Sequence, residues 1–282
     1  MGGKVTGDLD VLKWGGYRIV WADSRDPHAA IAYMEAHALD GIGISPVHGF
    51  AGDSLGFLAE SVRLKGLVVV DNEGIDLAPI EGCSLLEFLT IENVRGELHL
   101  DALTNLRDLN LGWNPRLRLP PADGANKLAR LQLWGYKADD LNLIPAYECL
   151  ACVSLVRSTA QTLAGIDRLR GLKQVDLAYC HRLRDVAAVT RLGSLDEFVA
   201  DHCKKIQDVS VLRKCVSLRI LGINNCGSLP SLGFVRDMHS LEELRFVNTT
   251  VIDGDLSPCV GLKRVGFMNK RHYSHTWEEL NG

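Results

Sequence analysis

The stretch Leu106-Arg107-Asp108-Leu109-Asn110-Leu111 decides the fold, because its spacing of leucines returns along most of the chain. Leu-x-x-Leu-x-Leu occurs eleven times at intervals of 20 to 25 residues, and all thirty-three defining positions are apolar. A repeat of this length predicts an array of small stacked units. The units begin at Leu39, Leu64, Leu86, Leu106, Leu128, Leu150, Leu172, Leu195, Leu218, Leu241 and Leu262.

The alternation of leucine with other residues predicts one short strand in each unit. Successive side chains of a strand point to opposite faces, so the leucines point inward and the residues between them point outward. A single unit is too small to bury its apolar face, and neighbouring units therefore stack and share a continuous core. The pattern predicts a parallel sheet with one buried face and one open face.

The ninth position of the units supports a resemblance to the leucine-rich repeat family, which covers about four-fifths of the chain. The family places Asn or Cys at this position, where a small side chain can hydrogen-bond backbone groups of a turn. The resemblance implies an α/β-type solenoid, a horseshoe with a parallel β-sheet on its concave side. Seven units fit, with Asn72, Asn114, Ser158, Cys180, Cys203, Cys226 and Thr249, and four depart, with Val47, Val94, Tyr136 and Lys270.

The segments between the strands predict short 3-10 or irregular turns on the convex side. In one of them, apolar residues recur every third position from Leu183 to Leu192, a spacing that suits a 3-10 turn better than an α-helix. The expected organisation is an N-terminal cap of a strand and a helix (residues 1–38), the solenoid (39–270) and a C-terminal closing segment (271–282).

The N-terminal cap carries two local signals. Residues 17–21 (Tyr-Arg-Ile-Val-Trp) predict an edge strand. The pair Asp26-Pro27 predicts a helix that runs to about Ala38, with Asp as N-cap and Pro in the first turn. Ile31, Met34 and Ala38 are expected on its inner face.

The closing segment carries a capping box. Thr276 precedes Glu279 by three residues, which predicts a short helix at the C-terminal end. Trp277 and Leu280 are expected to cover the last repeat. Both ends of the predicted stack are therefore capped.

Composition and charge exclude several classes of function. The 282 residues include 31 Lys and Arg against 35 Asp and Glu, a net charge of −4, whereas nucleic-acid binders usually carry a basic excess. No apolar run approaches the roughly 18 residues of a membrane span, and the N-terminus lacks the apolar core of a secretory signal. We expect a cytoplasmic protein with free thiols, no membrane partner and no nucleic-acid partner.

Cysteine and histidine supply the candidate chemistry. Cys180, Cys203 and Cys226 recur at 23-residue intervals, which indicates either a metal site with His181 and His202 or, as we prefer, a buried ladder of structural cysteines. The same residues offer a remote alternative, a Cys/His enzyme. The Cys149-x-x-Cys152 pair lacks a second pair and a thioredoxin-like context. The sequence predicts no catalytic residue, no metal and no cofactor.

The remaining place for function is the outward row of the strands. Trp113 and Trp134 mark either a binding surface, which we favour, or packing beneath a convex loop. We expect one contiguous patch in which Arg157 and Tyr179 continue the row; the alternative is a binding face on the N-terminal cap around Trp14 and Trp21. The predicted partner-binding residues are Trp113, Arg130, Trp134, Arg157, Asp176, Tyr179, Glu197, Asp201, His202, Asn224 and Arg245.

The sequence thus predicts non-enzymatic protein binding through the open sheet face. The resemblance includes bacterial immunity proteins, which bind and neutralise a co-produced toxin, and acidic residues such as Glu197 and Asp201 suit a toxin with a basic face. A general adaptor or scaffold for another protein complex is the alternative.

Overall fold

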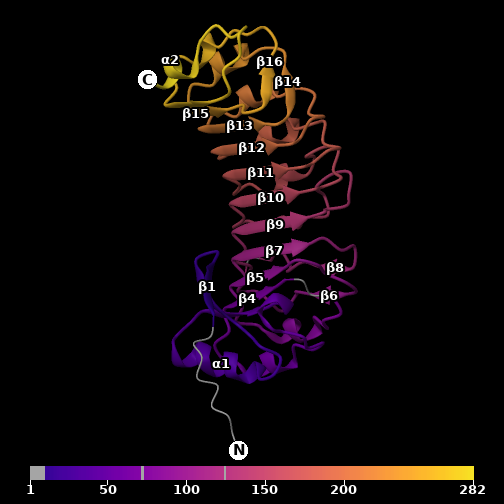
Figure 1. The fold of residues 1–282 in the computed structure, drawn as a ribbon. Coiled ribbons are helices and arrows are strands. Elements are labelled where there is room, and N and C mark those ends of the chain that lie inside the picture. The colour runs from indigo at the N-terminus through magenta and orange to yellow at the C-terminus, as the bar shows by residue number, and fades with distance from the viewer. Residues whose placement is uncertain (1–9, 71–72, 124) are drawn as a thin grey trace, which may run out of the picture. The chain divides into compact units, whose positions relative to one another are not determined.

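The computed structural model describes residues 10–70, 73–123 and 125–282. The chain forms two compact units, Met1–Leu128 and Ala129–Gly282, and the boundary falls inside the predicted array of repeats. Both units are built from parallel strands that follow one another in chain order (Figure 1).

The first unit holds a sheet in which β2, β3, β4, β5 and β7 are parallel and β1 pairs antiparallel with β2. A second, two-stranded sheet pairs β6 with β8. Its elements are β1 (Val11–Trp14), β2 (Tyr17–Trp21), α1 (Pro27–Ala36), β3 (Gly41–Ile44), η1 (Pro46–His48), η2 (Gly56–Glu60), β4 (Gly66–Val69), η3 (Ala78–Gly82), β5 (Phe88–Ile91), β6 (Leu98–His99), β7 (Asp108–Gly112) and β8 (Leu117–Arg118).

The second unit stacks β9, β10, β11, β12, β13, β15 and β17 in parallel, and β14 pairs with β16 beside this sheet. Its elements are β9 (Arg130–Trp134), β10 (Cys152–Val156), η4 (Ile166–Arg168), β11 (Gln174–Ala178), η5 (Ala187–Arg191), β12 (Glu197–Asp201), η6 (Ser210–Lys214), β13 (Ile220–Asn224), β14 (Gly227–Leu229), η7 (Gly233–Asp237), β15 (Glu243–Arg245), β16 (Thr249–Val251), η8 (Ser257–Cys259), β17 (Arg264–Gly266) and α2 (Trp277–Asn281).

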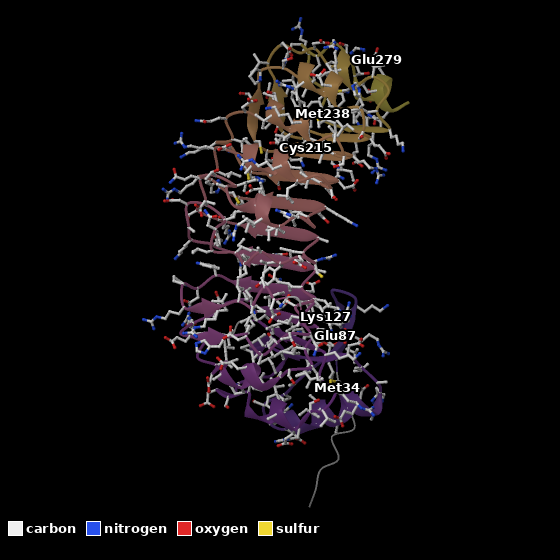
Figure 2. All side chains as sticks on the ribbon, turned by 180° about the vertical axis from the view of Figure 1, so that it is seen from behind. Met34, Glu87, Lys127, Cys215, Met238 and Glu279 are labelled. Carbon is white, nitrogen blue, oxygen red and sulfur yellow. The ribbon has the colours of Figure 1, made fainter. Side chains whose placement is uncertain are left out.

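The repeated leucine positions form the core, as the sequence predicts. Of the thirty-three apolar positions, all except Leu39 and Leu262 are buried. Met34 and Met238 also lie inside their units, whereas Lys127 and Glu279 lie on the outside (Figure 2). Each strand therefore contributes its alternate residues to a core that runs through its unit.

Short 3-10 helices connect the strands of both units, which confirms the expectation for these segments. In the second unit η4 to η8 follow one another, and each of the first four packs against the next. The four apolar residues spaced by three between β11 and β12 are all buried: Leu183, Val186, Val189 and Leu192. The three-residue apolar spacing therefore identifies these turns correctly.

Ninth-position side chains bond backbone groups of the neighbouring repeat. The Asn114 amide donates to the carbonyls of Val94 at 2.9 Å and Gly96 at 2.7 Å, and the Thr249 hydroxyl accepts the Cys226 N–H at 3.0 Å. Val47 departs most, since it is 80% exposed. Asn72, also predicted to fill this position, lies outside the described residues.

The N-terminal cap differs from the prediction in two respects. Tyr17–Trp21 is not an edge strand, because the antiparallel strand β1 lies beyond it. Gly15 and Gly16 join the two strands with positive φ angles of 57° and 94°, the geometry that a two-residue hairpin needs. The expected helix ends at Ala36 rather than about Ala38.

Helix α1 otherwise begins as predicted. The Asp26 carboxylate accepts the Ala29 N–H at 3.2 Å, as an N-cap does. Ile31 and Met34 are buried, but Ala38 is exposed at a φ of 49° beyond the helix end, so its predicted inner position is wrong. Ala30 takes that place in the core.

The C-terminal cap uses one residue beyond those expected. The capping box between Thr276 and Glu279 is present and α2 packs against β17, with Leu280 half-buried and Trp277 46% exposed. Asn281 also accepts the Val265 N–H at 2.8 Å and donates to the Val265 carbonyl at 2.9 Å. Its amide therefore takes the place of a further strand at β17.

The open face of the first unit is largely covered. Trp14 and Tyr17, from the β1–β2 hairpin, pack against the buried cluster of Ile19, Trp21, Val68 and Phe88. The Tyr17 ring stacks on Phe88 with 5.0 Å between the ring centroids. Outward positions of β3, β4 and β5 are consequently buried in this unit.

Candidate functional site

The second unit presents an open sheet face, because its outward strand positions carry mainly polar side chains. In β9, β11 and β12 the residues alternate between buried and partly or fully exposed. The strand register aligns these outward residues in three rows. The rows are Arg130, Cys152, Gln174, Glu197, Ile220 and Glu243; Gln132, Ser154, Asp176, Val199, Gly222 and Arg245; and Trp134, Val156, Ala178, Asp201 and Asn224.

A fourth row stands beyond the strand ends, where one residue in each of six repeats adopts a left-handed conformation. Its N–H groups continue the ladder: Tyr179 N donates to the Asp201 carbonyl at 2.9 Å, and His202 N donates to the Asn224 carbonyl at 3.0 Å. Gly tolerates positive φ, and Asn and His adopt it more often than other residues, whereas Arg and Tyr do so at a cost of roughly 1 kcal/mol each. The row comprises Gly135, Arg157, Tyr179, His202, Asn225 and Asn248.

The left-handed residues bring aromatic and polar side chains together. Tyr179 and His202 stack with 4.4 Å between ring centroids, and Tyr179 remains 40% exposed. The Asp201 carboxylate lies 2.9 Å from His202 Nδ1 and accepts the Asn225 amide at 2.8 Å. Asn248 donates to the Asn225 side-chain oxygen at 3.0 Å, so one connected network spans several repeats.

Acidic side chains gather beside this network. Burial raises the pKa of Asp176, and the neighbouring negative charge of Glu197 raises it further. Gln174 opposes these effects by donating a hydrogen bond to Asp176 at 2.9 Å. Glu243 is paired with Arg245 at 2.6 Å. The face therefore combines acidic side chains at β11 and β12 with a paired charge at β15.

Strand β10 forms a low strip on this face. Its outward side chains are small, and Cys152 and Val156 are only 8% and 9% exposed. Both lie beside long residues of β9, since Cys152 pairs with Arg130 and Val156 with Trp134. Trp134 is 43% exposed and rises beside this strip.

Three of the predicted binding residues lie outside the outward rows of the strands. Trp113 follows β7 in the first unit, and its indole nitrogen is buried, so it is less outward than expected. Arg157 and Tyr179 lie beyond the strand ends in the left-handed row rather than in the rows of Arg130 and Trp134. The expected contiguous patch stays a prediction.

The other predicted residues gather at the centre of the second unit. We call Asp176, Tyr179, Glu197, Asp201, His202, Asn224, Asn225, Arg245 and Asn248 the open-face cluster. Asn225 and Asn248 are expected on the outward face but not among the partner-binding residues, and their left-handed backbone has no local signal beyond their being asparagine. Glu243, which the sequence places in the same acidic group as Glu197 and Asp201, pairs with Arg245.

The cysteine ladder is buried as expected. Each thiol donates to backbone carbonyls, Cys203 to Asp201 at 3.3 Å and Cys226 to Asn224 at 3.0 Å. The hydrogen bond with the neighbouring Cys180 thiol, together with burial, raises the pKa of Cys203, which disfavours the reactive thiolate. Because Cys180 and Cys203 are at most 1% exposed, neither presents a nucleophile to substrate.

The residues proposed for a metal site are not arranged around a common point. His202 Nδ1 faces Asp201, and the ladder thiols face backbone carbonyls. Within residues 10–70, 73–123 and 125–282, no group of three or more His, Cys, Asp or Glu side chains could hold a metal ion. In the same ranges, neither α-helix has the length and hydrophobicity that crossing a bilayer requires.

Comparison with solved structures identifies the fold. An internalin (inlF) from Listeria monocytogenes matches with a TM-score of 0.61 at 17% identity, over 85% of this chain and 71% of the internalin. A leucine-rich repeat protein of Leptospira interrogans has a TM-score of 0.46 at 16% identity, over 80% of this chain and 53% of its own. The functional domain of the Listeria protein InlJ, which includes a cysteine ladder, has a TM-score of 0.45 at 17% identity, over 77% and 41%.

The chain therefore has the leucine-rich repeat solenoid fold, as the eleven repeats indicate. No family model and no curated protein matches its amino-acid sequence. The fold does not choose a partner, so the function has to be argued from the site.

Proposed function

We propose that the protein binds a partner protein through the open face of the second unit. The observation that carries this proposal is the strained, exposed part of the open-face cluster. Tyr179 and His202 keep a backbone conformation that costs free energy, yet their rings stack at the surface rather than in the core. Strained residues of this kind gather at ligand clamps and binding sites.

The topography of the face supports the same proposal. Exposed Trp134 and Tyr179 flank the low strip of β10, and aromatic anchors beside a recess are frequent binding hot spots. The network of Asp201, His202 and Asn225 fixes the polar groups in place before a partner arrives. A preorganised surface loses less conformational freedom on binding.

The charge of the face favours a partner with a basic surface. Asp176 and Glu197 lie close enough for their negative charges to interact, and Asp201 lies on the neighbouring outward row. We therefore propose an immunity-type role, in which the protein neutralises a co-produced toxin that has a basic face. The net charge of −4 agrees with this choice.

A general adaptor is the second candidate, and the arginines of the same face favour it. Arg130, Arg245 and Arg264 alternate with the acids, so a mixed surface with several partners also fits.

The two roles separate by co-expression with a candidate toxin that has a basic face. Immunity predicts that the wild-type protein restores growth and that a Tyr179→Ala, His202→Ala variant does not. Lys173→Ala, an exposed change outside the cluster, serves as the control. Co-purification with several housekeeping proteins and no protection would favour the adaptor. Failure of the double variant to alter any binding would contradict the proposed face.

A further inference from the structure

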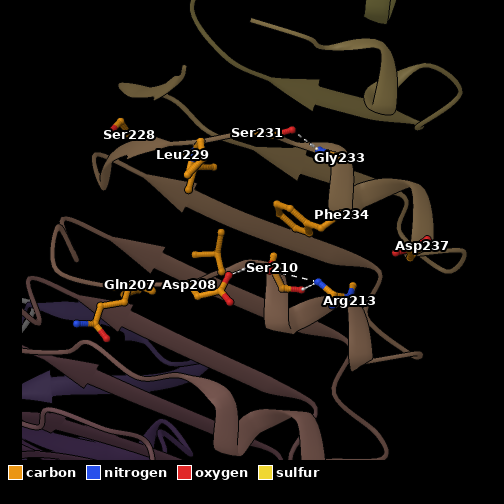
Figure 3. A pocket seen from close by; sticks show the side chains of 13 residues that line it. Gln207, Asp208, Ser210, Arg213, Ser228, Leu229, Ser231, Gly233, Phe234 and Asp237 are labelled. Atoms are coloured by element: carbon orange, nitrogen blue, oxygen red, sulfur yellow. Dashed lines mark hydrogen bonds between the residues drawn. The ribbon is translucent and has the colours of Figure 1, made fainter. Parts of the chain in front are cut away.

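A cleft of about 440 Å³ opens on the second unit between η6 and η7, apart from the open-face cluster. Leu229 and Phe234 line one side, and Asp208, Ser210 and Arg213 line the other. In Figure 3 the Leu229 and Phe234 side chains point toward the segment that carries Asp208 and Ser210. A volume of this size is in the range of ligand pockets.

Pro230 explains why the repeats part at this place. Along the side of the unit, Arg184 N donates to the Gln161 carbonyl at 2.9 Å, and Gln207 N donates to the Arg184 carbonyl at 3.0 Å. The next residue in this series is Pro230, which has no N–H to donate to the Gln207 carbonyl. The ladder resumes one repeat later, where Asp253 N donates to the Pro230 carbonyl at 3.2 Å.

The cleft also borders a strand edge. Strand β14 pairs with β16, and the Leu229 carbonyl accepts the Ile252 N–H at 2.9 Å on that side. Backbone groups of successive strand residues point to opposite edges, so the N–H and carbonyl of Ser228 point away from β16. Ser228 lines the cleft, which places a backbone donor and acceptor there for an added strand.

The charged side chains of the cleft favour a cation. Arg213 bonds the Ser210 carbonyl and hydroxyl at 3.4 and 3.3 Å, which holds its guanidinium on its own turn. Asp208 and Asp237 line the cleft too, and neither belongs to an ion pair within the described part of the chain. An aromatic ring beside two carboxylates suits the alkyl stem and charged head of Lys or Arg.

We propose that this cleft binds an extended peptide segment of a partner protein, which adds to β14 and places a Lys or Arg side chain beside Phe234. This second site is independent of the open-face cluster. Pro230 keeps it open by preventing the backbone bond that would close the two repeats.

The test uses the whole protein, labelled with ¹⁵N, and two blocked tripeptides, Val-Lys-Val and Val-Glu-Val. The basic peptide is expected to shift the amide signals of Ser228 and Gly233 and to bind about tenfold more tightly than the acidic one. The Asp208→Asn, Asp237→Asn variant should weaken it about fivefold. Asp101→Asn, an exposed carboxylate of the first unit, should leave it unchanged.

A second variant tests the backbone part of the proposal. Pro230→Ala supplies the missing N–H, so its amide should be protected from exchange and the basic peptide should bind less tightly. Equal binding of the two peptides, no shift at Ser228, or full affinity in the double Asp variant would overturn the proposal. Unchanged peptide binding together with a protected amide in Pro230→Ala would overturn it too.

Discussion

The two units use the same repeat but treat its outward face in opposite ways. Strands β3, β4 and β5 of the first unit are buried on both faces, whereas β11 and β12 of the second are buried on one. The difference lies in the β1–β2 hairpin, whose Trp14 and Tyr17 pack against the cluster that contains Val68 and Phe88. The residues between the apolar positions do not separate the units by themselves, since Val199 and Gly222 of the second unit match Val68 and Gly43 of the first.

The glycines of the first unit show how closely its cover fits. A Cβ at Gly43 would lie 2.4 Å from the Trp21 indole, and a Cβ at Gly41 would lie 2.0 Å from the Gly66 carbonyl oxygen. Trp21 is only 5% exposed, so it packs within the first unit, and the alternative binding face around Trp14 and Trp21 loses its main anchor. The leucines therefore define the solenoid, while the β1–β2 hairpin covers the outward face of the first unit.

The largest effect is expected in the core of the second unit. Cys203→Arg should lower the free energy of unfolding by about 4 kcal/mol, because it places an unpaired charge where the thiol is fully buried. Urea unfolding measures this change. Cys203→Ser should cost less, and Cys149→Arg, at an exposed thiol, should cost almost nothing. A stable Cys203→Arg protein would mean that the position does not face the core.

The covered face of the first unit should be nearly as intolerant. Gly41→Ala is expected to cost about 3 kcal/mol, since its Cβ would meet a backbone oxygen that cannot move aside easily. The thermal midpoint of the variant checks this. Gly82→Ala is the matched control, because its Cβ would meet nothing within 4 Å. Equal midpoints for the two variants would contradict the close packing of β3 and β4.

A glycine substitution in the left-handed row of the second unit should stabilise the protein rather than destabilise it. Arg157→Gly is expected to raise the free energy of unfolding by about 0.5 to 1 kcal/mol, because glycine relieves the strain at a φ of 55°. Chemical unfolding of Arg157→Gly and of Arg170→Gly, at ordinary φ, makes the comparison. If both glycines destabilise the protein alike, the backbone at Arg157 is not strained.

A smaller stabilisation should follow Asp176→Asn at neutral pH. The pKa of Asp176 is raised in the folded protein by burial and by Glu197, so its ionisation opposes folding. The folded state holds the proton more tightly than the unfolded state, and the penalty appears as pH rises through the carboxylate range and disappears below it. Thermal midpoints of both proteins across pH should therefore converge in acid and separate near pH 7. A constant difference would show that charge is not the cause.

The sequence predicts the parts of the fold that repetition determines. The apolar positions, the buried cysteines, the 3-10 turns and the capping box at Thr276 all follow from local spacing. It does not predict β1, although a Gly-Gly pair such as Gly15-Gly16 is typical of a hairpin turn. The cover over the first unit depends on contacts between distant segments such as Tyr17 and Phe88, which no local pattern encodes.

The candidate site was predictable only in part. Strand alternation places Asp176, Glu197 and Asn224 on the open face, as the structure does. The positions of Tyr179 and His202 depend on a left-handed turn at each residue, which the spacing of the leucines does not predict. Their role in binding remains a prediction.

The most direct test compares one variant of each unit for its effect on partner affinity and on the thermal midpoint. Trp134→Ala should weaken binding of the partner protein about thirtyfold or more, the loss expected for an aromatic hot spot, without lowering the thermal midpoint. Tyr17→Ala, which removes a ring stacked on Phe88, should lower the midpoint and leave the affinity unchanged. Affinity and midpoint measured on both variants, with Lys173→Ala as control, decide the matter. A Trp134→Ala protein that melts early yet binds normally would contradict the assignment of the open face as the binding surface.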